Sequence, residues 1–205
     1  MKLNLSFDQL AGYNIVSTPL PGIDIQGAKS AVYDAIKYLD IKPNTEIGTQ
    51  LSTNTFMDPA LVNLFHSAYD AVCFLHTHFT KQKIDRAYQN SWLLVLDPEE
   101  RYEAFHNHID FHKEYNVLTN YTWTYYIEIP DVCEGNEGKL AFKYDPVDGK
   151  EELLEVKEGH LYIFPSAAWH QPYNAPKASN KRITAAGNIN ISNSNKCFLF
   201  NVNNK

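Results

Sequence analysis

The stretch from residue 106 to residue 112, His-Asn-His-Ile-Asp-Phe-His, holds the densest group of metal-binding side chains in the chain. Alternate residues of a β-strand face the same side, so His106, His108 and Asp110 share one face, and His112 joins them if the strand continues. His108 and Asp110 form a His-x-Asp pair, in which an imidazole and a carboxylate are close enough to bind one ion. His106 and His108 form a competing His-x-His pair. The stretch therefore predicts a metal site and leaves open which pair provides the ligands.

A third ligand has to come from another part of the sequence, and His170 is the best candidate. It follows a strand-like segment, His-Leu-Tyr-Ile-Phe-Pro at 160–165, and a short loop after that segment would deliver its imidazole. Two histidines and one carboxylate leave coordination positions of the ion open, which suits non-haem iron(II) and oxygen chemistry. Zinc more often takes three protein ligands and one water in a tetrahedron. The set of His108, Asp110 and His170 therefore favours iron.

Two further polar residues follow about a dozen positions after His170. Arg182 and Thr184 point the same way on a predicted strand, and Lys181 points to the opposite face. A guanidinium can hold a carboxylate through two parallel hydrogen bonds, and the threonine hydroxyl adds a neutral donor beside it. This pair suits the end of a dicarboxylic co-substrate that is remote from the metal.

These features, taken in order, resemble a known family. A His-x-Asp pair, a later histidine in a Gly…Phe-Pro-Ser…His segment and an Arg-x-Thr pair are similar to the iron(II)/2-oxoglutarate-dependent oxygenases, above all to the small prolyl-hydroxylase-like members of bacteria and phages. The resemblance covers roughly residues 100–192, and residues 1–90 carry no pattern of that family. It implies a double-stranded β-helix, or jelly-roll, with iron at its open end.

The resemblance also implies the roles of the site residues. His108, Asp110 and His170 would bind iron(II), which 2-oxoglutarate would chelate through its 1-carboxylate and 2-oxo group. The 5-carboxylate would meet Arg182 and Thr184, O2 would take the last position, and ascorbate is a further cofactor candidate. Such a dioxygenase hydroxylates a prime substrate with release of succinate and CO2. A prolyl or other protein side chain is the first substrate class to consider, and a small metabolite is the second.

A neighbouring strand, predicted at 118–129, should run beside the co-substrate. In this family a Tyr or Asn on that strand often hydrogen-bonds the co-substrate, and Tyr125 and Asn120 are the candidates. Strand alternation separates Tyr125 from Tyr126, which falls on the other face. Simple aromatic packing on a barrel wall is the competing explanation for such residues.

The rest of the sequence has to build the frame for these residues. Two helices are predicted at 26–39 and 58–79, and the second has Asp58 as its N-cap and Pro59 in its first position. The histidines of the second helix, at 66, 76 and 78, are expected at its surface or its end. From Ser91 onward, short alternating segments separated by turn residues predict strands. These are 91–97, 103–109, 118–129, 139–145, 153–157, 160–165, 181–191 and 197–203.

This order of elements predicts a mainly β fold, a double-stranded β-helix with N-terminal helices packed on one sheet. We expect a single domain over 1–205, with a helical buttress at about 20–80 and a jelly-roll core at about 91–203. The net charge of -6 and the absence of any dense Lys/Arg run argue against nucleic-acid binding. No signal peptide and no membrane-length apolar run are expected.

Cysteine usage indicates a reducing compartment. Cys73, Cys133 and Cys197 are far apart and form no Cys-x-x-Cys pair, which argues against a disulfide framework and against a thiolate zinc site. Three unpaired thiols fit the cytoplasm. The family resemblance, in turn, implies a small-molecule co-substrate and a substrate protein or metabolite as partners.

Two alternative functions use the same architecture. A cupin-type metal enzyme would take its ligands from His106, His108, Glu114 and His170 and would not use 2-oxoglutarate. Its glutamate spacing is longer than the cupin pattern, and it leaves the Arg-x-Thr pair unexplained. A non-enzymatic jelly-roll binding module would use the aromatic side chains of strand 118–129 and would need no metal. Metal content separates this module from both enzymes.

Overall fold

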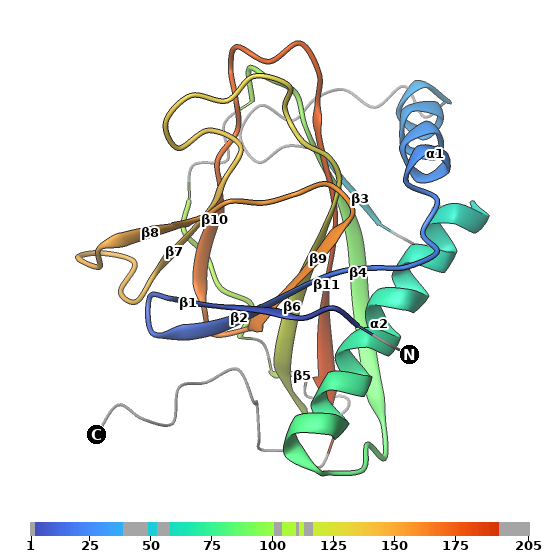
Figure 1. The fold of residues 1–205 in the computed structure, drawn as a ribbon, viewed down its shortest axis with the longest axis vertical. Helices are drawn as coiled ribbons and strands as arrows, with labels where there is room; N and C mark the ends of the chain where they lie inside the picture. The colour runs from blue at the N-terminus through green and yellow to red at the C-terminus, as the bar shows by residue number, and fades with distance from the viewer. Residues whose placement is uncertain are drawn as a thin grey trace.

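The computed structural model describes residues 3–38, 49–52, 58–100, 104–109, 111–112 and 117–192. In these residues two β-sheets face each other, and two helices cover the outer side of the larger sheet (Figure 1). The predicted jelly-roll with helices packed on one sheet is therefore confirmed. Asp110, Glu114 and the strand predicted at 197–203 lie outside the described residues.

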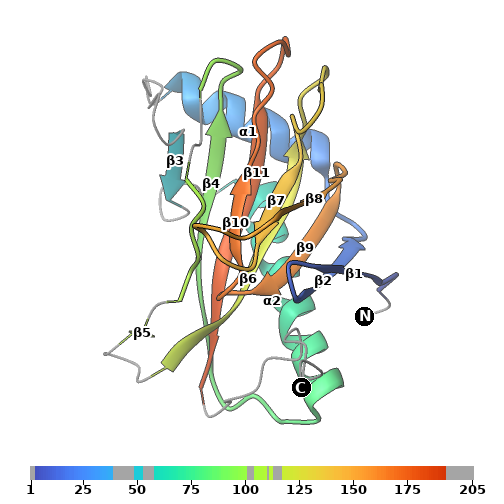
Figure 2. The same ribbon diagram turned by 90° about the vertical axis from the view of Figure 1, so that its left-hand side faces the viewer.

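The larger sheet brings together strands that are distant in sequence. Figure 2 shows its long strands side by side, with the helices behind them and the smaller sheet in front. In sheet order the strands are β1 (Ser6–Leu10), β2 (Tyr13–Pro19), β9 (His160–Pro165), β6 (Val117–Glu128), β11 (Arg182–Ile191), β4 (Ala87–Leu96) and β3 (Thr49–Ser52), and β5 (Phe111–His112) pairs with β6. The smaller sheet has the order β10 (Trp169–Pro172), β7 (Leu140–Lys143) and β8 (Glu151–Leu154).

Alternation along β6 divides the interior into two parts. Side chains at odd positions of this strand join the apolar core between the larger sheet and the helices, namely Tyr121, Trp123, Tyr125 and Ile127. Side chains at even positions face the space between the two sheets, namely Thr122, Thr124 and Tyr126. The helix side of the sheet is therefore a largely apolar core, whereas the other side carries polar groups that face the space between the sheets.

Helix α2 (Pro59–Thr80) is set by its caps and its apolar stripe. The Asp58 carboxylate accepts a hydrogen bond from the Ala60 N–H at 2.8 Å, and proline occupies the first turn. The helix ends at Lys81, whose left-handed backbone lets its N–H donate to the Thr77 carbonyl. Each fully buried aliphatic side chain of the stripe contributes roughly 1.5–3 kcal/mol, so tertiary packing holds this helix on the sheet.

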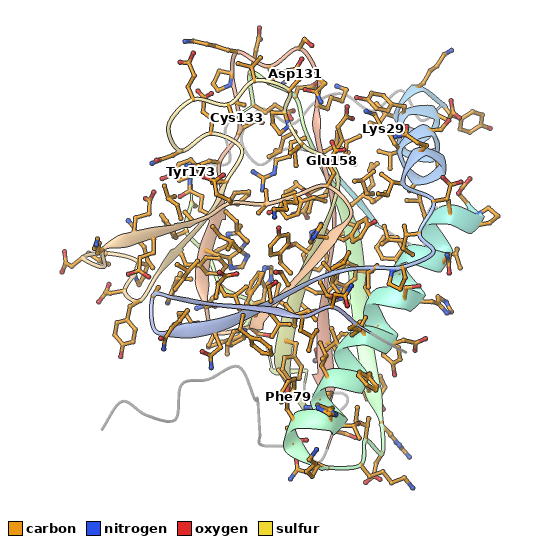
Figure 3. All side chains as sticks on the ribbon, in the orientation of Figure 1. Lys29, Phe79, Asp131, Cys133, Glu158 and Tyr173 are labelled. Atoms are coloured by element: carbon orange, nitrogen blue, oxygen red, sulfur yellow. The ribbon has the colours of Figure 1, made fainter. Side chains whose placement is uncertain are left out.

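Helix α1 (Ile25–Tyr38) is tied to the sheet by a polar contact. Lys29, labelled in Figure 3, places its ammonium 2.5 Å from the buried Glu128 carboxylate at the end of β6. The Tyr33 hydroxyl donates to the same carboxylate at 2.9 Å. Both predicted helices are thus present within about two residues of their expected bounds. Neither described helix has the length and apolar character needed to cross a bilayer.

Several expectations for the frame were wrong. The expectation of helices first and strands after missed β1, β2 and β3, which pair at the edges of the larger sheet. His76 was expected at the surface or a helix end, but it is fully buried, with Nδ1 2.7 Å from the Tyr121 hydroxyl. It continues the apolar stripe of α2 one turn after Val72, and Tyr121 supplies the polar partner that burial requires. Residue 170, expected in a loop, lies in strand β10.

Candidate metal centre

Three histidines meet in a cavity between the two sheets. One ring nitrogen of each of His106, His108 and His170 lies within 4.8 Å of the others. The ring centroids of His106 and His170 are 4.4 Å apart. The ring centroid of His108 lies 5.0 Å from that of His106 and 5.1 Å from that of His170. Three convergent imidazoles can bind a transition-metal ion such as iron(II) or zinc.

Backbone pairing places these rings. His106 and His170 form an antiparallel bridge. The His106 N–H donates to the His170 carbonyl at 3.1 Å, and the His170 N–H donates to the His106 carbonyl at 2.9 Å. Directly paired residues project their side chains to the same side of a sheet. The His108 N–H donates to the Ser166 carbonyl at 2.8 Å, which fixes the second histidine beside the first.

Two of the rings are also oriented by their Nδ1 atoms. His170 Nδ1 lies 2.9 Å from the Ala168 carbonyl, and His106 Nδ1 lies 3.2 Å from the Ala104 carbonyl. A carbonyl oxygen only accepts, so both Nδ1 atoms carry the hydrogen, and in both rings Nε2 is the nitrogen whose lone pair can bind a metal ion. A metal-binding histidine is held in this way, because the bond at one nitrogen fixes the tautomer at the other.

Burial keeps the three imidazoles neutral. It lowers the pKa of His170 well below its usual value, with smaller contributions from His106 and His108. Burial, followed by the charge of His106, lowers the pKa of His108 to about 4. The pKa of His106 is lowered by burial as well. Each ring is therefore uncharged near neutral pH, the form that binds a metal ion.

A buried arginine lines the same cavity. Arg182 is 1% exposed, and its guanidinium donates to the Tyr126 hydroxyl at 2.9 Å and to the Tyr173 carbonyl at 2.5 Å. Figure 3 labels Tyr173, which follows β10 on the smaller-sheet side. Arg182 forms no ion pair with a carboxylate of the described residues, and its Nε has no hydrogen-bond partner among them. Lys181, in contrast, is paired with Asp97, and both side chains are half-buried.

Two buried hydroxyl groups next to this arginine also lack partners. In the part of the chain that the structure describes, neither Thr184 Oγ1 nor Thr124 Oγ1 has a hydrogen-bond partner. Both residues line the cavity together with Arg182 and Tyr126. Buried polar groups are nearly always satisfied, so unpartnered donors around one cavity indicate a polar ligand.

The expected site residues divide into those that the cavity gathers and those that it does not. It gathers four of them, His108, His170, Arg182 and Thr184, and it adds His106. Asp110 lies outside the described residues, as does Glu114 of the cupin alternative.

The two candidates on the neighbouring strand do not line the cavity. Tyr125 packs in the core on the helix side of the sheet. The Asn120 side-chain oxygen accepts a hydrogen bond from the Ile191 N–H at 2.7 Å. The tyrosine that faces the cavity is Tyr126, which was not among the expected co-substrate ligands.

Comparison with known proteins identifies the fold. No protein-family model matches the chain, and no curated protein matches it. Among solved structures, a prolyl-4-hydroxylase from Pseudomonas putida superposes with a TM-score of 0.59 at 15% identity, covering 92% of this chain and 93% of that chain. A viral collagen prolyl hydroxylase from Paramecium bursaria Chlorella virus-1, in a 2-oxoglutarate complex, gives a TM-score of 0.58 at 16% identity, with 86% and 95% covered. The chain shares their fold.

A third similar structure widens the chemistry of this group. It is a non-haem α-ketoglutarate-dependent carbocyclase from nogalamycin biosynthesis, with a TM-score of 0.61 at 14% identity, covering 88% of this chain and 80% of that chain. Identities this low establish the architecture, and one fold hosts many reactions. The function of this chain therefore has to be argued from its own cavity.

Proposed function

We propose that this protein is an iron(II)- and 2-oxoglutarate-dependent dioxygenase that hydroxylates a prime substrate and releases succinate and CO2. One observation carries the proposal. The guanidinium of Arg182, buried and without a carboxylate partner among the described residues, lines the same cavity as three neutral histidines. The cavity thus offers a cation at one place and metal ligands at another.

The buried guanidinium calls for an anion. Transfer of an isolated charge out of water costs several kcal/mol even after the protein relaxes, and a paired carboxylate offsets much of this cost. The unpartnered hydroxyl groups of Thr184 and Thr124 can donate to the same carboxylate. The Tyr126 hydroxyl accepts from Arg182, so its own hydrogen can also be directed to that ligand.

A ligand that satisfies both parts of the cavity needs a carboxylate at one end and a metal-chelating group at the other. 2-Oxoglutarate has these two ends, in its 5-carboxylate and its 2-oxo acid. Iron(II) bound by the histidines would supply the redox chemistry that activates oxygen. The protein binds the co-substrate, keeps the imidazoles neutral and excludes water with buried walls such as Phe164, whose ring centroid is 4.7 Å from that of His170.

The prime substrate belongs to one of two classes. Two of the similar structures are prolyl hydroxylases by name, which supports a prolyl or other protein side chain, and a carbocyclase among them supports a small metabolite. Free thiols at Cys73 and Cys133 agree with a reducing cytoplasm, where iron(II) persists. The cupin alternative also uses the histidines, but it gives the buried Arg182 no ligand.

The test compares 2-oxoglutarate with pyruvate, which has the same 2-oxo acid but no distal carboxylate. Protein loaded with iron(II) without oxygen is titrated with each acid by calorimetry, then exposed to oxygen and assayed for succinate. We expect 2-oxoglutarate to bind and to yield succinate, and pyruvate to bind at least about tenfold more weakly because it leaves Arg182 unpaired. Equal binding of both acids, together with no succinate, would refute the proposal.

A further inference from the structure

We propose that His106, and not Asp110, is the third protein ligand, so that three neutral imidazoles hold the metal. The inference rests on the proposed function for its choice of iron(II), although the ligand set itself can be tested without 2-oxoglutarate. It departs from the two-histidine, one-carboxylate set that the sequence resemblance implies. Three features of the structure support it.

The first is the register between the two segments that carry the ligands. His106 is paired directly with His170, and their ring centroids show the shortest separation in the group, at 4.4 Å. A hydrogen-bonded antiparallel pair has Cα atoms about 5.5 Å apart. Position 106 therefore faces His170 directly across the bridge, and its imidazole lies beside the two other histidines of the cavity.

The second is the backbone that fixes His106. Its N–H and C=O both bond to His170, at 3.1 and 2.9 Å. Its Nδ1 lies 3.2 Å from the Ala104 carbonyl, the same arrangement that His170 makes with Ala168 at 2.9 Å. The two rings are thus held by matching contacts, and both direct Nε2 away from the carbonyl that holds them.

The third is the partner of His108. Its Nδ1 lies 3.4 Å from the Asn188 amide nitrogen, and the amide oxygen lies 2.9 Å from the Thr122 hydroxyl. A threonine hydroxyl both donates and accepts, so an amide turned by 180° keeps both contacts, with its oxygen accepting from His108 Nδ1–H and its nitrogen donating to Thr122. In that orientation all three histidines carry the hydrogen on Nδ1 and offer Nε2 to one ion. Asn188 is then a positioning residue for the centre.

A centre of this kind has a distinct charge. Three neutral ligands leave both positive charges of the ion uncompensated by the protein, whereas a carboxylate ligand would cancel one of them. An anionic chelator such as 2-oxoglutarate should therefore tighten metal binding, and the metal should tighten its binding by the same factor.

The test measures metal binding rather than turnover. Cobalt(II) is titrated into the full-length protein and into His106→Ala, Asp110→Ala and His160→Ala, with affinity and the visible ligand-field spectrum as readouts. His160 is the matched control, because its Nδ1 also meets a carbonyl two residues earlier, that of Glu158 at 3.1 Å, but its ring does not line the cavity. We expect His106→Ala to lose more than the roughly 10- to 100-fold in affinity that removal of an outer hydrogen bond causes. We expect the Asp110 and His160 variants to bind like wild type.

Three further variants guard against a folding defect. His106→Asp places a carboxylate at the bridged position and should restore cobalt binding with an altered spectrum, because that side chain can still ligate. Asn188→Asp keeps an acceptor for His108 Nδ1–H and should bind cobalt, whereas Asn188→Leu should lose roughly 10- to 100-fold in affinity.

The outcomes separate this inference from the proposed function. Loss of cobalt in Asp110→Ala, with wild-type binding in His106→Ala, overturns the three-histidine centre and leaves the dioxygenase proposal standing. Loss in His106→Ala with rescue by His106→Asp supports the centre. If cobalt binds in that way but 2-oxoglutarate neither tightens it nor is consumed with iron(II), the centre stands and the dioxygenase proposal fails. A wild-type protein that binds no cobalt overturns the centre.

Discussion

Replacing Thr184 by valine should make the protein more stable and its 2-oxoglutarate site weaker. Thr184 is 4% exposed and lies on β11, two residues from Arg182, and its hydroxyl has no hydrogen-bond partner in the described ranges. Valine has nearly the same shape, so the change removes the hydroxyl and leaves the packing. Stability and affinity change in opposite directions because the buried hydroxyl destabilises the ligand-free protein but donates a hydrogen bond to 2-oxoglutarate when the ligand is bound.

The magnitudes follow from the surroundings of the hydroxyl group. A buried hydroxyl without a partner costs about 1–3 kcal/mol, so its removal should raise the free energy of unfolding of the ligand-free protein by about 1 kcal/mol. A hydrogen bond to a charged carboxylate contributes about 1.5–3 kcal/mol, so its loss should raise the Kd of 2-oxoglutarate roughly 10- to 140-fold.

The assay pairs urea denaturation without ligand with calorimetric titration of 2-oxoglutarate into manganese-loaded protein. Thr18→Val is the matched control, since Thr18 is fully buried in β2, its hydroxyl bonds to the Pro19 carbonyl at 3.2 Å, and it does not line the cavity. The control should leave 2-oxoglutarate affinity unchanged. If Thr184→Val binds 2-oxoglutarate as tightly as wild type, the carboxylate does not sit beside this strand and the reasoning is wrong.

Three further predictions concern binding and stability. Arg182→Met should raise the Kd of 2-oxoglutarate at least about tenfold, because the distal carboxylate loses its cationic partner; unchanged calorimetric affinity would contradict the proposed anion site. Gly187→Ala should destabilise by about 1–3 kcal/mol in urea denaturation, because a Cβ at this position would lie 2.7 Å from the buried Trp123 ring. An unfolding free energy equal to that of wild type would show that the Trp123 ring shifts to accommodate the added methyl group. Burial lowers the pKa of His76 below 6.5, so the unfolded chain binds the proton more readily, and stability falls as pH drops through 6.5 toward the lower folded pKa. Wild type should therefore lose more unfolding free energy than His76→Phe between about pH 7 and about pH 5, and equal losses would count against a neutral buried ring.

Strand alternation predicted which residues of the site share one face of a strand. Which of the two faces lines the cavity depends on how strands that are distant in sequence pair with one another. Alternation correctly put Arg182 and Thr184 together and separated Tyr125 from Tyr126. It could not show which tyrosine accompanies Thr184, because that depends on the pairing of β6 with β11. The structure pairs Thr184 with Tyr126, next to a register shift between Ile183 and Thr184. An irregularity of this kind leaves no clear signal in one sequence.

The competition between His106 and Asp110 has the same origin. Both positions share the parity of His108, so strand alternation treats them alike. Only the bridge from His106 to His170 distinguishes position 106, and it joins segments far apart in the chain. The edge strand β1, Ser6–Leu10, was missed for a different reason. Its composition is largely polar and its burial is slight, so it lacks the apolar alternation by which strands are recognised.

The two backbone hydrogen bonds between His106 and His170 can report whether the metal site is occupied. Their two amides point at each other's carbonyls, so each exchanges its hydrogen with solvent only when the pair opens. An ion that clamps both rings would oppose that opening. Deuterium uptake at these two amides should therefore slow as the ion is added, by a factor that grows with its free concentration relative to its Kd. Occupancy could then be followed from the backbone alone, with a spectroscopically silent ion such as zinc.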